Sequence, residues 1–121
     1  MIAFNDHNML FTINSDGTQK VFIDSAIFQT WSPDGNSLAY IHSISAQLKV
    51  TSNLGLTKTD IVNVPTMGEA HPCWSVDGKN IACETWTGNY DKSTVSMRMV
   101  NVAARTSSII ATAAQYPFFL Q

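Results

Sequence analysis

Three histidines are the side chains of this 121-residue sequence that are best suited to acid–base or metal chemistry: His7, His42 and His71. An imidazole changes its charge near neutral pH and is the commonest metal ligand in proteins. The sequence contains no HExxH, CxxC, GxSxG or phosphate-loop motif that would assign a reaction to them. We therefore predict no catalytic residue, no metal ligand and no cofactor, and we treat the histidines as candidate binding residues.

The composition excludes several classes of protein. Apolar residues make up 45% of the chain, as in globular domains, but charged residues make up only 13%, against about 25% in an average domain. This profile excludes a disordered chain, a charged helical bundle and a coiled coil. The net charge of −2 leaves no basic patch for nucleic acid, and no apolar run approaches the roughly 18 residues of a membrane span. Neither a nucleic acid nor a membrane is expected as a partner.

The cellular compartment is left open by the sequence. Residues 1–14 have no basic region and no long apolar run, so they do not form a signal peptide. The protein is either cytosolic or has lost a leader. The two cysteines, Cys73 and Cys83, are too few for a disulfide framework and lack the spacing of a zinc site. We expect both to be small buried thiols.

An internal repeat indicates which elements position the candidate residues. The segment Trp31-Ser32-Pro33-Asp34-Gly35 recurs 43 residues later as Trp74-Ser75-Val76-Asp77-Gly78. The match continues at the same spacing, because Leu38-Ala39-Tyr40 aligns with Ile81-Ala82-Cys83. A period in the low forties is the length of one four-stranded propeller blade.

The chemistry of the repeated segment predicts a tight turn between two strands. Pro33 fixes φ at the first corner, Asp34 can bond backbone amides, and Gly35 can adopt the positive φ that closes the turn. The flanking residues 27–31 and 37–41 are short apolar and aromatic runs typical of strands. Each repeat therefore contains a hairpin in which the tryptophan ends one strand.

The remainder of each repeat also has strand character, and no window shows a helical period. Further strands are predicted at residues 9–14, 48–52 and 97–102, and outer strands at residues 21–23, 60–64 and 108–111. The chain is predicted to be all-β.

At the two Trp-Ser-x-Asp-Gly segments the chain resembles the TolB-like β-propeller family, which repeats such a turn before an apolar strand. A related turn is present at Asn14-Ser15-Asp16-Gly17. In the second copy Val76 replaces the proline, and Phe119 stands where a third tryptophan would be. The resemblance implies a β-propeller fold. It is weak for function, because this type of propeller occurs in scaffolds, peptidases and sugar-active enzymes.

We label the four strands of a blade a to d, outward from the channel. On this count the chain holds as many strands as three four-stranded blades, displaced by one strand. Residues 1–26 supply strands b–d of a first blade, residues 27–69 a second blade and residues 70–114 a third, and residues 115–121 form a lone strand a. The simplest closed arrangement is a homodimer forming a six-bladed ring, in which each lone strand completes the first blade of the partner chain. A fragment of a longer propeller and a nine-bladed trimer remain alternatives.

Propeller topology places the candidate residues on one face. The connections between strands b and c, and those between d and a, open on the same rim, opposite the Asp-Gly turns. The residues expected there, around the channel mouth, are His7, His42, Glu69, His71, Trp86 and Tyr90. Large aromatic side chains are favoured in binding hot spots. The alternatives are that His7 and His42 are merely exposed hairpin residues and that His71 is a rim residue capping strand a. Trp86 could instead pack against a neighbouring blade.

Because the fold explains most of the sequence and no catalytic motif is left over, we predict a non-enzymatic binding module, with a protein, peptide or small molecule bound at this rim. The alternative is a metal-dependent enzyme, similar to sugar-lyase or hydrolase propellers. The resemblance to sugar lyases lies in the pair His71-Pro72, which precedes the Trp-Ser turn. A third hypothesis is a self-assembling scaffold without a ligand. Trp31, Trp74 and Phe119 are predicted to be core residues between blades.

Overall fold

The computed structural model consists of antiparallel strands. It describes residues 1–52, 57–63, 71–86 and 95–112. Within these ranges there are ten strands, namely β1 (Ile2–Asp6), β2 (Met9–Ile13), β3 (Val21–Trp31), β4 (Ser37–His42), β5 (Gln47–Ser52), β6 (Thr57–Asn63), β7 (Cys73–Trp74), β8 (Asn80–Trp86), β9 (Val95–Asn101) and β10 (Thr106–Thr112). The all-β prediction is confirmed. The part of the chain that the structure describes holds no helix of a length and apolarity that could cross a membrane.

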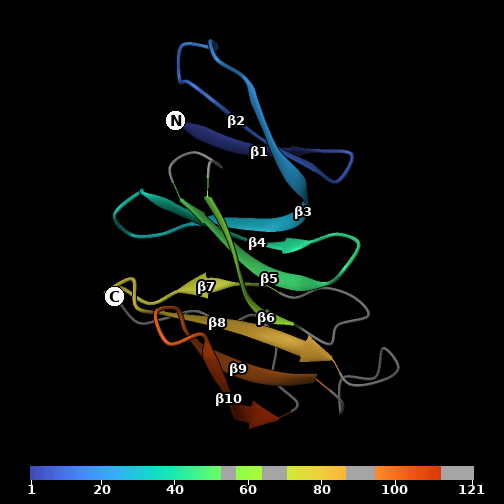
Figure 1. The fold of residues 1–121 in the computed structure, drawn as a ribbon, viewed down its shortest axis with the longest axis vertical. Coiled ribbons are helices and arrows are strands. Elements are labelled where there is room, and N and C mark those ends of the chain that lie inside the picture. The colour runs from blue at the N-terminus through green and yellow to red at the C-terminus, as the bar shows by residue number, and fades with distance from the viewer. Residues whose placement is uncertain (53–56, 64–70, 87–94, 113–121) are drawn as a thin grey trace.

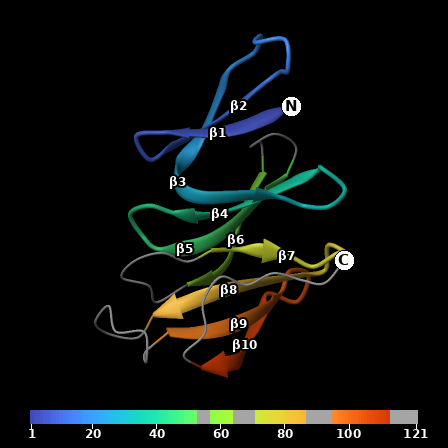
Figure 2. The same cartoon turned by 180° about the vertical axis from the view of Figure 1, so that it is seen from behind.

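The strands form two sheets, which we divide into three blades. One sheet has the order β1-β2-β3-β4-β5-β6 and the other the order β10-β9-β8-β7. The first blade is β1, β2 and residues 21–25 of β3, the second is residues 26–31 of β3 with β4, β5 and β6, and the third is β7 to β10. The blades follow one another along the long axis of the molecule, with the first at the top of Figure 1 and the third at the bottom, and Figure 2 shows the same order from behind.

The first two blades share β3 rather than a loop. Met9 in β2 pairs with Ser25, and the next residue of β3, Ala26, pairs with His42 in β4. The expected boundary between residues 26 and 27 thus lies inside one continuous strand. The change of direction is taken up by a β-bulge between Ile27 and Thr30 and by Phe28, whose φ of 55° lies in the left-handed region. Both devices bend a strand without ending it.

The two Trp-Ser-x-Asp-Gly turns have the same hydrogen bonds. In the first, Ser32 Oγ donates to Asp34 Oδ1 at 2.6 Å, and the Asn36 amide donates to the same oxygen at 3.0 Å. In the second, the corresponding distances to Asp77 Oδ1 are 2.6 Å from the serine hydroxyl and 2.9 Å from the Lys79 amide. Gly35 and Gly78 have φ of 75° and 71°, which a glycine adopts without the strain of a side chain. The repeat in the sequence is therefore a repeat of one turn geometry.

The apolar core lies between blades. One cluster joins the first and second blades, with the partly buried Trp31 packed against it; it consists of Leu10, Ile23, Ala26, Leu38 and Tyr40. The other joins the second and third blades and consists of Ala39, Ile41, Leu48, Val50, Trp74, Ile81, Cys83 and Val100. Both tryptophans thus lie at blade junctions, as predicted. Phe119, the third predicted core aromatic, is outside the described residues.

Trp74 ties two blades together, which predicts a large effect of its removal. Its side chain is 7% exposed, and its Nε1 donates to the Thr30 carbonyl oxygen of the second blade at 3.1 Å. We expect Trp74→Ala to lower the free energy of unfolding by about 3–5 kcal/mol, because it leaves a cavity at the junction. Trp74→Phe retains most of the packing and loses the hydrogen bond, at a cost nearer ~1 kcal/mol from that bond. Urea unfolding followed by circular dichroism measures both, and equal losses for the two variants would contradict this account of the junction.

Candidate functional site

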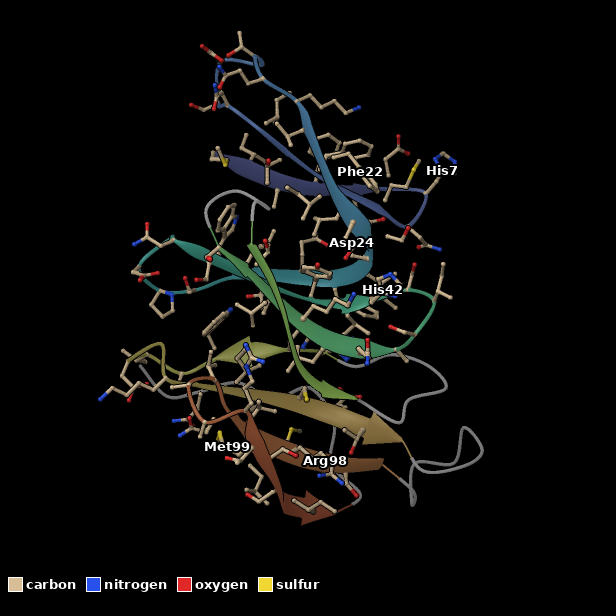
Figure 3. The ribbon with its side chains drawn as sticks, in the orientation of Figure 1. His7, Phe22, Asp24, His42, Arg98 and Met99 are labelled. Atoms are coloured by element: carbon tan, nitrogen blue, oxygen red, sulfur yellow. The ribbon has the colours of Figure 1, made fainter. Side chains whose placement is uncertain are left out.

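The three histidines occupy separate positions on three blades. His7 lies in the turn between β1 and β2, His42 ends β4, and His71 comes two residues before β7. His7 and His42 lie at the end of the blades opposite the Asp-Gly turns (Figure 3). The structure does not gather the histidines into one cluster. Instead, each lies beside a carboxylate of its own surroundings.

His7 is the most exposed of the three. Its side chain is 89% exposed, and its Nδ1 lies 2.6 Å from Asp6 Oδ1. His7 and Asn8 both have positive φ, at 51° and 62°. Two such residues in succession are typical of a tight two-residue hairpin turn. His7 is thus a turn residue facing solvent, which is the simpler of the two interpretations of its sequence position.

His42 belongs to a half-buried polar network centred on Asp24, and both are labelled in Figure 3. His42 Nε2 lies 3.6 Å from Asp24 Oδ1, and the Tyr40 hydroxyl donates to Asp24 Oδ2 at 2.8 Å. Lys49 Nζ is 3.9 Å from the same Oδ2. The Ser45 amide donates to His42 Nδ1 at 3.1 Å, on the side of the ring away from the Nε2 atom that faces Asp24. The network fixes the orientation of the imidazole at the rim.

His71 forms the most buried of the three pairs. Its Nδ1 lies 2.8 Å from Oε1 of Glu84, whose side chain is 1% exposed, and its ring centroid is 4.7 Å from that of Phe28 in the second blade. Cys73 pairs with Ala82, and extending this antiparallel register by two residues brings His71 opposite Glu84. The pair therefore joins neighbouring strands of the third blade, while the ring contact joins that blade to the second.

The repeat explains where this pair comes from. Residues 43 apart are equivalent in the second and third blades, so His71 corresponds to Phe28 and Glu84 corresponds to Ile41. Two apolar residues of the second blade are thus replaced by two polar residues in the third, although the bulge in β3 makes Ile27, and not Phe28, the strand partner of Ile41. A buried charged group is tolerated only with such a partner. A glutamate at a strand position that is apolar in the other copy was the signal that could have identified this site.

The remaining predicted binding residues are located only in part. Trp86 is the last residue of β8, and the position of its side chain lies outside the described part of the chain, as do Tyr90 and Glu69 as whole residues. Two residues that the sequence did not suggest, Asp24 and Glu84, are the carboxylates that position His42 and His71. Asp24 carries no sequence signal comparable to that of Glu84.

The two cysteines are better suited to packing than to reaction. Burial raises the pKa of the Cys83 thiol to about 12; nearby Arg98 opposes that shift and Glu84 adds to it. The thiol therefore stays protonated and is a poor nucleophile or ligand. Cys83 is buried as predicted, whereas Cys73 is only half-buried. Within residues 1–52, 57–63, 71–86 and 95–112, no group of three His, Cys, Asp or Glu side chains could hold a metal ion.

Known structures resemble this fold. No family model matches the sequence, and no curated protein does. TolB from Acinetobacter baumannii superposes with a TM-score of 0.66 at 17% identity, covering 85% of this chain and 26% of that one. Acylaminoacyl peptidase from Pyrococcus horikoshii gives a TM-score of 0.65 at 14% identity, with 84% and 19% covered. An oligogalacturonate lyase in complex with manganese gives 0.62 at 18% identity, with 85% and 29% covered.

These likenesses establish the fold and not the activity. The chain spans only 19–29% of the length of these three proteins, and they differ in function. A TolB-like propeller architecture is thus supported, as the resemblance implied. The same architecture carries a TolB protein, a peptidase and a lyase, so the likeness does not choose among them.

The contrast between His71 and His7 predicts a difference in stability. His71→Ala removes a hydrogen bond to a buried carboxylate and should lower the free energy of unfolding by about 1.5–3 kcal/mol. His7→Ala, matched in chemistry but made in an exposed turn, should leave it unchanged within error. Urea unfolding of both variants beside the wild type measures the difference. A similar small effect of both would show that Glu84 does not depend on His71.

Proposed function

We propose that the chain is a non-enzymatic β-propeller binding module that assembles with a second copy and binds a protein, peptide or small ligand at the histidine-bearing rim. The observation that carries this proposal is the apolar face that the first blade turns away from the second. A blade with a partly exposed apolar face can bury it against another blade of a larger ring. A ring formed from copies of the chain brings several rims together around one channel mouth.

The outer face of the first blade carries three phenylalanines in a row across its strands, which we call the phenyl row: Phe4, Phe11 and Phe22. Lys20 Nζ lies 5.5 Å from the Phe4 ring centroid and 4.3 Å from that of Phe11, so the chain itself covers part of the row. The centroids of Phe4 and Phe11 are 5.5 Å apart, and those of Phe11 and Phe22 are 5.7 Å apart. Their neighbours Leu10 and Ile23 point the other way, into the core shared with the second blade. Phe22 is 54% exposed, so this face still presents apolar surface whose burial would be favourable.

The edge of the first blade offers a second point of attachment. Among the strands that the structure describes, β1 is the outermost of its sheet, and such an edge presents backbone groups to which a further strand can pair. We propose that residues 115–121 of a second copy supply that strand, as the strand count predicts. These residues lie outside the described part of the chain, so the support for this step comes from the repeat and from the edge position of β1 among the described strands.

A second copy of the chain is the proposed partner for the phenyl row, because each copy has such a row for the other to cover. If the third blade of one copy covers the phenyl row of the other, two-fold symmetry repeats the same contact and closes the ring. The result is six blades, within the usual range of four to eight. A nine-bladed trimer satisfies the same contact and is distinguished by mass.

A metal-dependent enzyme is the second candidate, and the pair of His71 with Glu84 is the observation that favours it. The lyase neighbour is known in complex with manganese, and the pair lies next to Pro72 as the sugar-lyase resemblance requires. Against it, His7 and His42 are each engaged elsewhere and would have to leave their carboxylates to join a common site. The binding module therefore explains more of the geometry.

The mass in solution tests the assembly. We expect light scattering coupled to size exclusion to give twice the 13.3 kDa chain mass for the wild type. Phe22→Asp places a charge in the phenyl row and should give a monomer. Ile44→Asp makes the same change at a residue that is 84% exposed in the β4–β5 turn and should leave the dimer intact. A monodisperse wild-type monomer would contradict the assembly.

Partner capture tests the rim. Wild type and a Trp86→Ala/Tyr90→Ala variant are used as bait in extracts of the source organism, with Ile110→Ala, an exposed apolar change on β10, as the matched control. We expect the double variant to lose a partner that the wild type and the control retain. Equal recovery by all three would remove this rim as the binding face. Metal analysis of the same preparation separates the two candidates, since stoichiometric manganese or zinc would favour the enzyme.

A further inference from the structure

A small hollow lies at the end of the molecule opposite the histidine rim, between the Asp-Gly turns of the second and third blades. Its volume is about 220 Å³. The residues that form it and enter the argument are Pro33, Asp34, Trp74, Val76, Asp77 and Val102. Because both turns and the β9–β10 connection contribute to it, the hollow exists only where two blades are stacked.

The wall of the hollow is part apolar and part polar. Pro33, Val76 and Val102 supply aliphatic surface, and the Trp74 indole, which donates to the Thr30 carbonyl oxygen, also lines it. Ser32 and Ser37 supply polar surface. A Cβ on Gly78 would come within 3.8 Å of the Pro33 ring, which shows how closely the two turns approach. The walls therefore belong to the blade junction and are fixed by its packing.

The mouth of the hollow carries permanent negative charge. Hydrogen bonds from the Ser32 hydroxyl and the Asn36 amide lower the pKa of Asp34, and those from Ser75 and Lys79 do the same for Asp77. Both carboxylates are exposed, and in each turn the serine hydroxyl and a backbone amide donate to Oδ1. The nearby Lys79 also lowers the pKa of Asp77, so its ammonium group partly offsets the negative charge of the two carboxylates.

We propose that this hollow binds an arginine side chain of a partner protein. At about 220 Å³ it is larger than the roughly 150 Å³ cavity that accommodates benzene but smaller than the roughly 300–1,000 Å³ of pockets for drug-sized ligands. One long side chain is a guest of that size. Its aliphatic stem matches the proline and valine walls, and a planar guanidinium is the cation whose fork suits carboxylates. The site is independent of the histidine rim.

The test uses one peptide pair and the full chain. Acetyl-Gly-Arg-Gly-amide is titrated into the labelled protein by NMR, beside the same peptide with citrulline, which has the shape of arginine without the charge. We expect the arginine peptide to shift the Trp74 indole and the Gly35 and Gly78 amides at millimolar concentration. The citrulline peptide should bind about fivefold more weakly or worse, the size of one exposed ion pair.

Variants of the turns locate the effect. Asp34→Asn/Asp77→Asn retains an oxygen for the turn hydrogen bonds and removes the charge, so it should weaken the arginine peptide about fivefold without loss of the fold. Asp16→Asn is the matched control, because Asp16 accepts the same kind of bonds from Thr18 but does not line the hollow. Lys79→Gln removes the competing cation and should tighten binding.

Four results would overturn the proposal. They are equal binding of the arginine and citrulline peptides, shifts that lie away from the hollow, the same loss in Asp16→Asn as in the double variant, and the absence of any shift with the arginine peptide. None of these results bears on the histidine rim, so the failure of this site and the failure of the proposed function are distinguishable.

Discussion

The structure depends on one constraint: a four-stranded antiparallel blade cannot bury its own faces. The two apolar clusters lie between blades, one from Leu10 to Tyr40 and one around Trp74 and Ile81. Ladder hydrogen bonds hold each sheet together, but removal of apolar surface from water is gained only when a second sheet covers the first. The apolar burial that stabilises the fold therefore lies at the blade junctions. The partly exposed phenyl row follows from the same constraint.

The Ser-Asp-Gly turns make the junctions reproducible. Each ends the strand that carries a junction tryptophan, and the hydroxyl, carboxylate and amide bonds of the two turns agree in distance to about 0.1 Å or better. The side chains that bond within the turn are short, so little conformational freedom is lost in fixing them. A rigid turn next to a large indole sets where the next strand starts. This is why a motif of five residues predicted hairpins, tryptophan positions and blade length.

The sequence could not predict two kinds of feature: the place where a strand bends, and contacts between side chains of different strands. Phe28 has a positive φ, which residue preference alone would not suggest. Asp24 meets Tyr40 and His42 across two strands of a bent sheet, a contact that spacing does not reveal. The histidines were expected to gather at one mouth because topology places their connections on one rim. Topology fixes the rim, however, and not the directions of side chains, and each imidazole is oriented by a carboxylate of its own.

The two ends of the blades differ in how they can carry function. At the turn end, the two copies of the repeat have nearly the same residues and the same bonds, so chemistry there comes from what two adjacent turns enclose together. At the rim end the copies diverge, because Phe28 and Ile41 in one blade become His71 and Glu84 in the next. A polar pair is not needed to stabilise positions that apolar residues already fill in the neighbouring blade. The polar pair therefore costs desolvation that an apolar pair avoids, and a contribution to recognition at the rim is the reason we infer for its presence.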